Sequence, residues 1–159
     1  MSSSPEPTLA DALRLDQQLC FALYTASRLM TRAYRPVLEP LGLTYPQYLV
    51  MLVLWEESTD AREVPTVKRV GERLLLDSGT LTPLLKRLEA QGLVHRRRSE
   101  VDEREVRVEL TDAGAALREQ ALHVPLAMLC KVDATPNDLV DLRDRLRDLV
   151  RAFPDESTP

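Results

Sequence analysis

The sequence predicts a mainly helical protein that carries one small β-hairpin, and three observations favour this class. Apolar residues recur at three- and four-residue intervals over most of the chain, which is the period of an amphipathic helix. Residues 93–98 and 106–110 instead show the alternation that is typical of strands, with a charged segment between them. With 159 residues, of which 44% are apolar, the chain supplies one hydrophobic core and too little material for two.

The N-terminal helix is expected from about residue 8 to residue 34, because its apolar positions share one face and neither Gly nor Pro interrupts it. Pro36 and Pro40 should break it or restart it. The two ends of the chain, residues 1–7 and 154–159, are polar and rich in proline, so we expect disordered tails there.

A second helix is expected from Thr44, which offers a capping hydroxyl, with a proline in the first turn and Gln47 at the third helical position. Residues 48–55 are nearly all apolar and should lie in the core. Residues 57–65 are polar and broken, which predicts a loop.

The central segment predicts two short helices and a hairpin. The helices are expected over residues 67–75 and 80–91, with a turn at 77–79 between them and a glycine after the second. Strands are expected over residues 93–98 and 106–110, joined by a charged tip.

Two further helices are predicted to close the chain. Thr111 opens one that should run to about residue 129. Thr135, followed by a proline and an acidic residue, opens another that should run to about residue 153, with one apolar side formed by Leu139, Leu142, Leu146 and Leu149.

Two short helices, a tight turn and a two-stranded ribbon describe a winged helix-turn-helix, whose second helix enters the major groove of DNA. Hydroxyl groups on that helix can approach base edges, and cations on the helix and the hairpin can approach phosphates. The residues of these kinds are Ser78, Thr80, Thr82, Lys86, Arg87, Arg96, Arg97, Arg98, Arg104 and Arg107.

The net charge of −4, with a sequence pI near 5.3, at first argues against a nucleic-acid partner. Between Lys68 and Val108, however, there are ten Lys or Arg residues and seven Asp or Glu residues. This segment therefore has a net charge of +3, and the rest of the chain has −7. Because counterion release depends on local phosphate contacts, a basic face on an acidic body can bind a polyanion. The alternative is that the arginine run is only a solvated hairpin.

The central segment closely resembles the MarR family of dimeric bacterial repressors. The resemblance rests on LLLDSGTLTPLLKRLE at residues 74–89, GLV at 92–94 and DER at 102–104, and it extends from about residue 15 to residue 153. It implies a dimer whose interface is formed by the N- and C-terminal helices. The expected layout is one domain over residues 8–153, with dimerisation segments 8–44 and 111–153 and the winged helix-turn-helix at 45–110.

The same resemblance adds Pro83 and Asp102 to the expected DNA-binding residues. It implies that Asp102 and Arg104 pin the tip of the wing while the arginine reaches into the minor groove. The plain alternative is an exposed ion pair, which would contribute at most about 1 kcal/mol.

Two cysteines, Cys20 and Cys130, are too few and, at 110 residues apart, too widely spaced for a disulfide scaffold or a zinc site. They are either inert packing residues or redox-active thiols. Tyr24 is a helical neighbour of Cys20 at i+4. Tyr34 lies 14 residues on, about 21 Å along an unbroken helix, and Tyr45 lies beyond two prolines. Contact of either phenol with the thiol would therefore need a dimer interface.

The tyrosine spacings of +14 and +25, together with LTYPQY at residues 43–48, resemble the organic-hydroperoxide-sensing branch of the MarR family, the OhrR-like repressors. The resemblance implies that Cys20 is the peroxide sensor, that Tyr34 and Tyr45 contact it across the dimer, and that Tyr24 is a neighbour in the same pocket. It also implies that Cys130 is the resolving cysteine, which forms a disulfide with the sensor of the other subunit. Otherwise Cys130 is a buried filler.

The chemistry agrees with this interpretation. A thiolate attacks a peroxide O–O bond efficiently, and phenolic donors stabilise that anion and lower the thiol pKa. The first product is a sulfenic acid, and closing a disulfide needs Cα atoms within about 7 Å, so helices would move. An organic hydroperoxide is favoured over hydrogen peroxide by an apolar surround, here Leu19, Phe21, Leu23 and Leu49.

The leading hypothesis is a homodimeric transcriptional repressor that binds a pseudo-palindromic DNA duplex when reduced and leaves it when an organic hydroperoxide oxidises Cys20. Two alternatives stay open. One is a MarR-type repressor that a small aromatic ligand releases, with incidental cysteines. The other is a thiol peroxidase, which is disfavoured because no cradle for the departing oxygen is evident, so we do not expect an enzyme.

No metal, cofactor or membrane partner is expected. His95 and His123 have no Cys, Asp or Glu at ligand spacing. The 29% charged residues and the absence of a long apolar run argue against a membrane span, and the N-terminus lacks the basic and apolar regions of a signal peptide. We expect a cytoplasmic protein.

Overall fold

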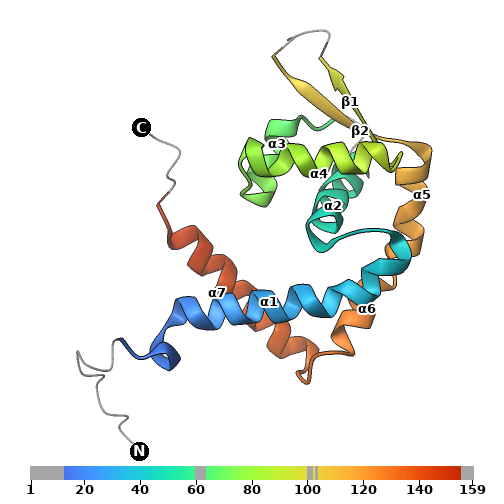
Figure 1. Ribbon diagram of the computed structural model, residues 1–159. Helices are drawn as coiled ribbons and strands as arrows, with labels where there is room; N and C mark the ends of the chain where they lie inside the picture. Colours follow the sequence, from blue (N-terminus) through green and yellow to red (C-terminus); the bar gives the residue numbers. More distant parts are fainter. Residues whose placement is uncertain (1–12, 60–63, 100–101, 103, 155–159) are drawn as a thin grey trace, which may run out of the picture. The chain divides into compact units, whose positions relative to one another are not determined.

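Helices make up most of the structure, together with one hairpin of two strands (Figure 1). The computed structural model describes residues 13–59, 64–99, 102 and 104–154. The chain divides into two compact units, one through Val124 and one from Pro125. The predicted fold class is confirmed, whereas the predicted dimer interface and the predicted single domain remain predictions. Of the predicted tails, only Pro154 lies within the described residues.

The N-terminal helix begins later than the sequence predicts. A 3-10 turn, η2 (Leu15–Gln17), precedes helix α1 (Leu19–Leu38). Residues 8–12 lie outside the described part. Leu13 and Leu15 are 91% and 58% exposed, so tertiary packing, which supplies most helical stability, does not support a helix at this stretch.

Pro36 does not break α1, contrary to the prediction. The helix continues through Pro36 to Leu38, whose side chain is fully buried, so the packing of this last turn outweighs the one backbone hydrogen bond that proline removes. Pro40 is the second residue of a 3-10 turn, η3 (Glu39–Leu41), which follows directly. Gly42 adopts the left-handed region at φ +66°, which ends the turn and directs the chain into the next helix.

Helix α2 (Tyr45–Thr59) supplies the centre of the core, as predicted, with Met51 and Leu54 buried. It extends beyond the prediction, because Glu57 to Thr59 are helical and not part of a loop. The Glu57 carboxylate accepts hydrogen bonds from Arg69 at 3.1 Å and Arg73 at 3.0 Å, and these bonds stabilise the last turn. Residues 60–63 lie outside the described part.

Helices α3 (Val67–Leu74) and α4 (Ser78–Ala90) form the predicted helix-turn-helix. Leu75 makes the turn between them in the left-handed region, at φ +52°. Asp77 caps α4, and Gly92, at φ +72°, ends it. The apolar face of α4 is buried through Leu81, Leu85 and Leu88.

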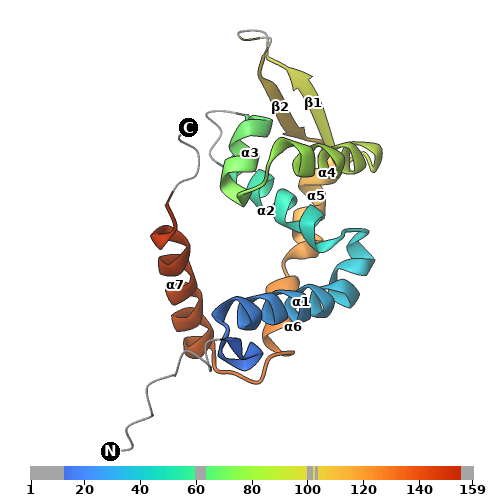
Figure 2. The same cartoon turned by 60° about the vertical axis from the view of Figure 1, so that its left-hand side comes forward.

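The predicted hairpin follows as antiparallel strands β1 (Val94–Arg98) and β2 (Val106–Leu110), and it projects beyond α4 (Figure 2). Val94 and Val108 are buried at its base. An isolated bridge between Thr66 and Arg107 ties β2 to the start of α3. The base of the hairpin is thus fixed to the helix-turn-helix.

Helix α5 (Asp112–Ala121) starts where two backbones meet closely. A Cβ on Gly114 would lie 2.0 Å from the Leu93 carbonyl oxygen, so only glycine fits. The Gly114 carbonyl accepts the Trp55 indole N–H at 2.8 Å. Thr111 caps the helix and donates its hydroxyl to the Gly92 carbonyl at 2.6 Å.

The helix predicted to reach residue 129 is broken. Pro125 lacks the N–H that would donate to the Ala121 carbonyl, and its ring would clash with that group, so α5 stops and α6 (Val124–Leu129) begins anew. His123, expected within a helix, lies in the intervening turn, with its Nδ1 atom 2.6 Å from the Gln120 carbonyl oxygen.

In the second unit, helix α7 (Pro136–Ala152) begins with the predicted cap. Thr135 and Asp138 form a capping box, with the two backbone N–H bonds each 3.2 Å long. Within the described residues, no side chain of α7 is classed as buried. Its large apolar residues that are exposed are Val140, Leu142, Leu146 and Val150.

No single helix of the described chain is both long and apolar enough to cross a membrane; the segments Leu19–Leu41 and Tyr45–Ser58 reach that size only when combined across a 68° bend. Within the same residues, no group of three His, Cys, Asp or Glu side chains is arranged to hold a metal ion.

Candidate functional site

The outer face of α4 presents the small hydroxyl residues expected to meet DNA. Ser78 and Thr80 are exposed in the first turn, and Thr82 is half-buried. The Thr80 hydroxyl donates to Asp77 at 2.8 Å, and the Thr82 hydroxyl donates to the Ser78 carbonyl at 2.6 Å, so each keeps its oxygen as an acceptor. The bonds from the Thr80 hydroxyl and backbone lower the pKa of Asp77, which keeps this cap anionic. Further along the helix, Pro83, Lys86 and Arg87 are also exposed.

The arginines of β1 play different parts. Arg96 donates from its backbone to Glu89 of α4 at 3.0 Å and from Nε at 2.9 Å, so it braces the wing against the helix. The Arg96 side chain is also the main cause of the lowered pKa of Glu89. Arg97 lies 3.8 Å from Glu109, and Arg98 is exposed without a described partner. Arg97 and Arg98 are therefore the cations on this strand that are most accessible to a phosphate.

At the tip of the wing, Asp102 acts through the backbone. Its carboxylate accepts the Arg104 N–H at 3.0 Å, and its carbonyl accepts the Glu105 N–H at 2.9 Å. Ser99 and Glu105 close the base of this turn through a backbone bond of 2.9 Å. The Arg104 residue is exposed, so the described tip holds Arg104 by its backbone and leaves its side chain open to solvent.

Both thiols are free and exposed. Cys20 lies in the first turn of α1, with its Sγ atom 3.9 Å from Gln18 Oε1. Cys130 follows α6 in the other unit, and its N–H donates to the Leu126 carbonyl at 3.2 Å. The exposure of Cys130 does not support the alternative of a buried filler.

Two of the three predicted pocket tyrosines meet within one chain. The rings of Tyr34 and Tyr45 lie 4.7 Å apart, between centroids, where α1 approaches the start of α2. Tyr48 joins them, 5.9 Å from Tyr34, and continues to Trp55 at 6.4 Å. Tyr24 is 58% exposed and lies outside this ring cluster, although it lines the same groove as Tyr45. Its hydroxyl accepts a hydrogen bond from Arg28 at 3.0 Å.

Burial raises the pKa of the Tyr34, Tyr45 and Tyr48 phenols. For Tyr34 and Tyr48, the potential charge of the neighbouring phenols raises the pKa further. These groups therefore stay protonated near neutral pH and can act as hydrogen-bond donors to an anion.

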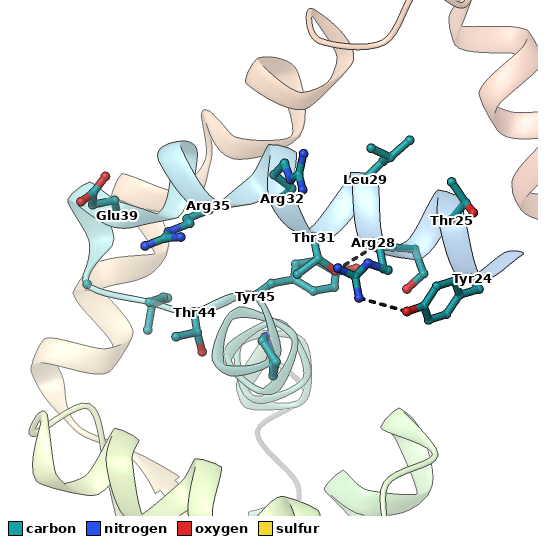
Figure 3. A pocket seen from close by; sticks show the side chains of 14 residues that line it. Tyr24, Thr25, Arg28, Leu29, Thr31, Arg32, Arg35, Glu39, Thr44 and Tyr45 are labelled. Carbon is teal, nitrogen blue, oxygen red and sulfur yellow. Dashed lines mark hydrogen bonds between the residues drawn. The ribbon is translucent and has the colours of Figure 1, made fainter.

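A groove of about 950 Å³ lies between α1 and the start of α2 (Figure 3). Tyr45 extends into it from α2 towards Thr31 and Arg28, and the Arg28–Tyr24 hydrogen bond closes one end. The groove is also lined by Arg32 and Arg35, neither of which pairs with a carboxylate of the described chain. It combines phenols, aliphatic hydroxyls and the three guanidinium groups of Arg28, Arg32 and Arg35 with one carboxylate, that of Glu39.

Sequence patterns missed three contributors to this region. Tyr48 was expected only as a core residue, and the groove arginines carried no motif. The side chain of Gln47, expected only as a cap, is buried at 4% exposure and donates from Nε2 to Gln91 Oε1 at 3.1 Å. The residues of this pair are 44 positions apart, so no local pattern could have revealed it.

Comparison with known proteins gives consistent matches. The family described as "Transcriptional regulator SarA/Rot" matches residues 32–120. An organic hydroperoxide resistance transcriptional regulator of Bacillus subtilis (strain 168) is 50% identical over 143 residues, which are 90% of this chain and 94% of the relative.

Two solved structures of AbfR, a protein of Staphylococcus epidermidis, are similar as well. Reduced AbfR bound to DNA has 39% identity and a TM-score of 0.66 over 89% of this chain and 97% of that chain. Disulfide-formed AbfR has 38% identity and a TM-score of 0.59 over 89% and 96%. The matched relatives are transcriptional regulators and not enzymes, which removes the thiol peroxidase alternative.

Proposed function

The chain belongs to the SarA/Rot family of MarR-type transcriptional regulators, and from this premise we propose that it is a homodimeric repressor that organic hydroperoxides release from DNA. The observation that carries the proposal is the tyrosine pair. Tyr34 and Tyr45 lie 4.7 Å apart, while α1 runs unbroken from Cys20 and separates the thiol from Tyr34 by about 21 Å. We infer that the phenols instead receive Cys20 of the partner subunit.

The winged helix-turn-helix supplies the DNA-binding part of the proposal. The exposed hydroxyls of Ser78 and Thr80 begin the helix that would enter the major groove. On the wing, Arg98 would lie along the phosphates and Arg104 would reach into the minor groove. Reduced AbfR, a similar protein, is bound to DNA in its solved structure, which supports the same role here. We propose that the operator is pseudo-palindromic, because a two-fold dimer presents two such helices. We also propose a cytoplasmic location, because the bacterial DNA that carries an operator lies there.

Exposed apolar side chains support the homodimer. They gather on the segments expected to form the interface, and a single chain leaves them in water, at a cost of about 25 cal/mol per Å². These residues are Leu13, Leu15, Leu19, Leu122, Leu126, Leu129, Val140, Leu142, Leu146, Val150 and Phe153.

The proposed chemistry is a two-electron oxidation of Cys20. The thiolate attacks the terminal oxygen of ROOH, the S–O bond forms as the O–O bond breaks, and the alkoxide takes a proton to leave as ROH. Protonated phenols of Tyr34 and Tyr45 favour the thiolate by donating hydrogen bonds to it. The product is Cys20 sulfenic acid.

Cys130 is proposed to resolve this product. Its thiolate attacks the sulfenic sulfur of the partner subunit's Cys20, the S–S bond forms, and hydroxide leaves and is protonated to water. Exposure of both thiols makes the reaction accessible. Because a disulfide restrains its Cα atoms to about 7 Å, the bond would reposition the two halves of the dimer and thereby the two α4 helices.

DNA binding before and after oxidation tests the proposal. The probe is a duplex selected from a random library by the reduced protein, and the oxidant is cumene hydroperoxide. The wild type should lose the duplex, whereas Cys20→Ser should bind it and keep it. Cys130→Ser should form a sulfenic acid without the covalent dimer that the wild type shows on a non-reducing gel. Peroxide release of Cys20→Ser would contradict the sensor assignment.

The groove beside Tyr45 favours a second candidate, release by a small aromatic anion. Arg28, Arg32 and Arg35 provide positive charge, and the tyrosines provide rings on which such a ligand could stack. Sodium benzoate would then release a variant that lacks both cysteines. If that variant keeps the duplex in benzoate while the wild type releases it in peroxide, the redox proposal is favoured.

A further inference from the structure

A continuous chain of hydrogen bonds joins the start of α2 to the end of α4. The Thr44 N–H and hydroxyl donate to Gln47 Oε1 at 2.9 and 3.0 Å. Gln47 Nε2 donates to Gln91 Oε1 at 3.1 Å, and Gln91 Nε2 donates to the Gly42 carbonyl at 2.8 Å. We call these four residues the amide bridge.

The direction of the amide bridge is fixed at both ends. A backbone N–H of Thr44 can only donate, and the carbonyl of Gly42 can only accept. Both glutamine amides must therefore point the same way for every bond to form. A flipped amide would set two donors or two acceptors against each other, so the bridge specifies one arrangement of its two helices.

The amide bridge connects two functionally important places in the structure. Gly42 and Thr44 flank the turn that leads directly into Tyr45, and Gln91 is the C-terminal cap of α4. Gln47 is one of two side chains classed as buried and polar within the described residues, the other being Ser99. An apolar residue at position 47 would fill the same space, but it could not form the hydrogen bonds that fix the arrangement of α2 relative to α4.

We propose that the amide bridge couples the position of Tyr45 to the orientation of α4, the helix proposed to enter the DNA groove. The inference rests on the proposed redox-controlled DNA binding. When oxidation of the partner subunit's Cys20 displaces the Tyr45 phenol, the first turn of α2 shifts with it. Because Gln91 is hydrogen-bonded to Gln47 and to the Gly42 carbonyl, the C-terminal end of α4 moves with this turn. Because α4 is about 20 Å long, a small rotation at its C-terminal end moves its N-terminal hydroxyls across the base edges.

The test is the ratio of DNA dissociation constants for oxidised and reduced protein, measured with the selected duplex and cumene hydroperoxide. In Gln91→Met the side chain keeps its length but loses both hydrogen bonds. Its rate of Cys20 oxidation should match the wild type, and its ratio should fall by about tenfold, the usual size of a coupling between two sites. Gln120→Met is the control, because Gln120 is exposed on α5 outside the bridge. A wild-type ratio in Gln91→Met overturns the inference.

A double variant separates coupling from stability. Each single variant, Gln47→Met or Gln91→Met, leaves the other amide without its partner and should unfold at a lower urea concentration. The double variant replaces both amides by apolar chains of similar shape, so its urea midpoint should return towards that of the wild type. The ratio should stay low. Recovery of the ratio together with the midpoint would show that the bridge only stabilises the fold, and would overturn the inference. If the oxidised wild type itself keeps the duplex, the proposed function fails and the coupling fails with it. If the oxidised wild type releases the duplex and the variants show the same ratio of dissociation constants, the proposed function stands and only the coupling fails.

Discussion

Adding one methyl group at Gly114 should loosen the junction between α5 and the hairpin. A Cβ there would lie 2.0 Å from the Leu93 carbonyl oxygen and 3.0 Å from its carbon, and real Cβ contacts begin near 3.0 Å. The two backbones must therefore separate by at least the difference, 3.0 − 2.0 = 1.0 Å. The two nearest atoms belong to the backbone, so movement of the third neighbour, the Leu110 side chain at 3.3 Å, would not relieve the clash.

The separation would disturb two hydrogen bonds. The Leu93 carbonyl accepts the Thr111 N–H at 3.1 Å, and the Gly114 carbonyl accepts the Trp55 indole N–H at 2.8 Å. Leaving a buried polar group unpaired costs about 1–3 kcal/mol. Alanine returns up to about 1 kcal/mol of helix propensity. The expected result for Gly114→Ala is a loss of about 3 kcal/mol in the free energy of unfolding.

Urea unfolding followed by far-UV circular dichroism measures this loss. Wild type and variant must be compared at one chain concentration, because association adds to apparent stability. Gly79→Ala is the matched control, since its Cβ would meet only the end of the Asp77 side chain, at 3.0 Å. An unchanged midpoint for Gly114→Ala would refute the steric argument.

Three other substitutions test separate parts of the structure. Because burial and then the charge of Tyr34 raise the pKa of Tyr48, Tyr34→Phe should let Tyr48 ionise at lower pH in an ultraviolet absorbance titration; an unshifted titration contradicts the ring cluster. Because the folded state raises these phenol pKa values, the phenols add to the free energy of unfolding in full below about pH 10, the unfolded value. This contribution is lost as the pH rises through the raised pKa values. Arg98→Gln should reduce the salt slope of DNA binding by about 1, and an unchanged slope would remove Arg98 from the phosphate contacts. Leu75→Gly should raise the free energy of unfolding by about 0.5–1 kcal/mol, because Leu75 is 78% exposed at φ +52°; a loss on urea unfolding would count against strain at this turn.

Two prolines show where sequence patterns stop being informative. Pro36 was expected to break or restart a helix and does not, because the last turn of α1 buries Leu38. Pro125 was not expected to break one and does. Val124 and Met128 beyond it are buried, but they are buried on the new helix α6, in whose first turn Pro125 needs no N–H partner. The local chemistry of both prolines is the same, so the outcome depends on tertiary packing that no local pattern contains.

The helix-turn-helix, the hairpin and the family were predicted correctly, because their signals are local. Asp77 and Gly92 mark the ends of α4 by their own chemistry. The approach of Tyr34 to Tyr45 was suggested only by resemblance, since α1 must turn into α2 before the rings meet. Gln91 carried no local signal at all.

The row of rings ending at Trp55 gives the chain an intrinsic optical reporter. Tyr45, Tyr34, Tyr48 and Trp55 follow one another with centroid separations of 4.7, 5.9 and 6.4 Å. Excitation energy absorbed by a phenol passes to a nearby indole through dipolar coupling, and the transfer depends steeply on distance and orientation. Trp55 is the sole tryptophan of the sequence, so all energy transfer from this row ends on one indole. A displacement of the Tyr45 ring can therefore be followed in real time in the unlabelled protein.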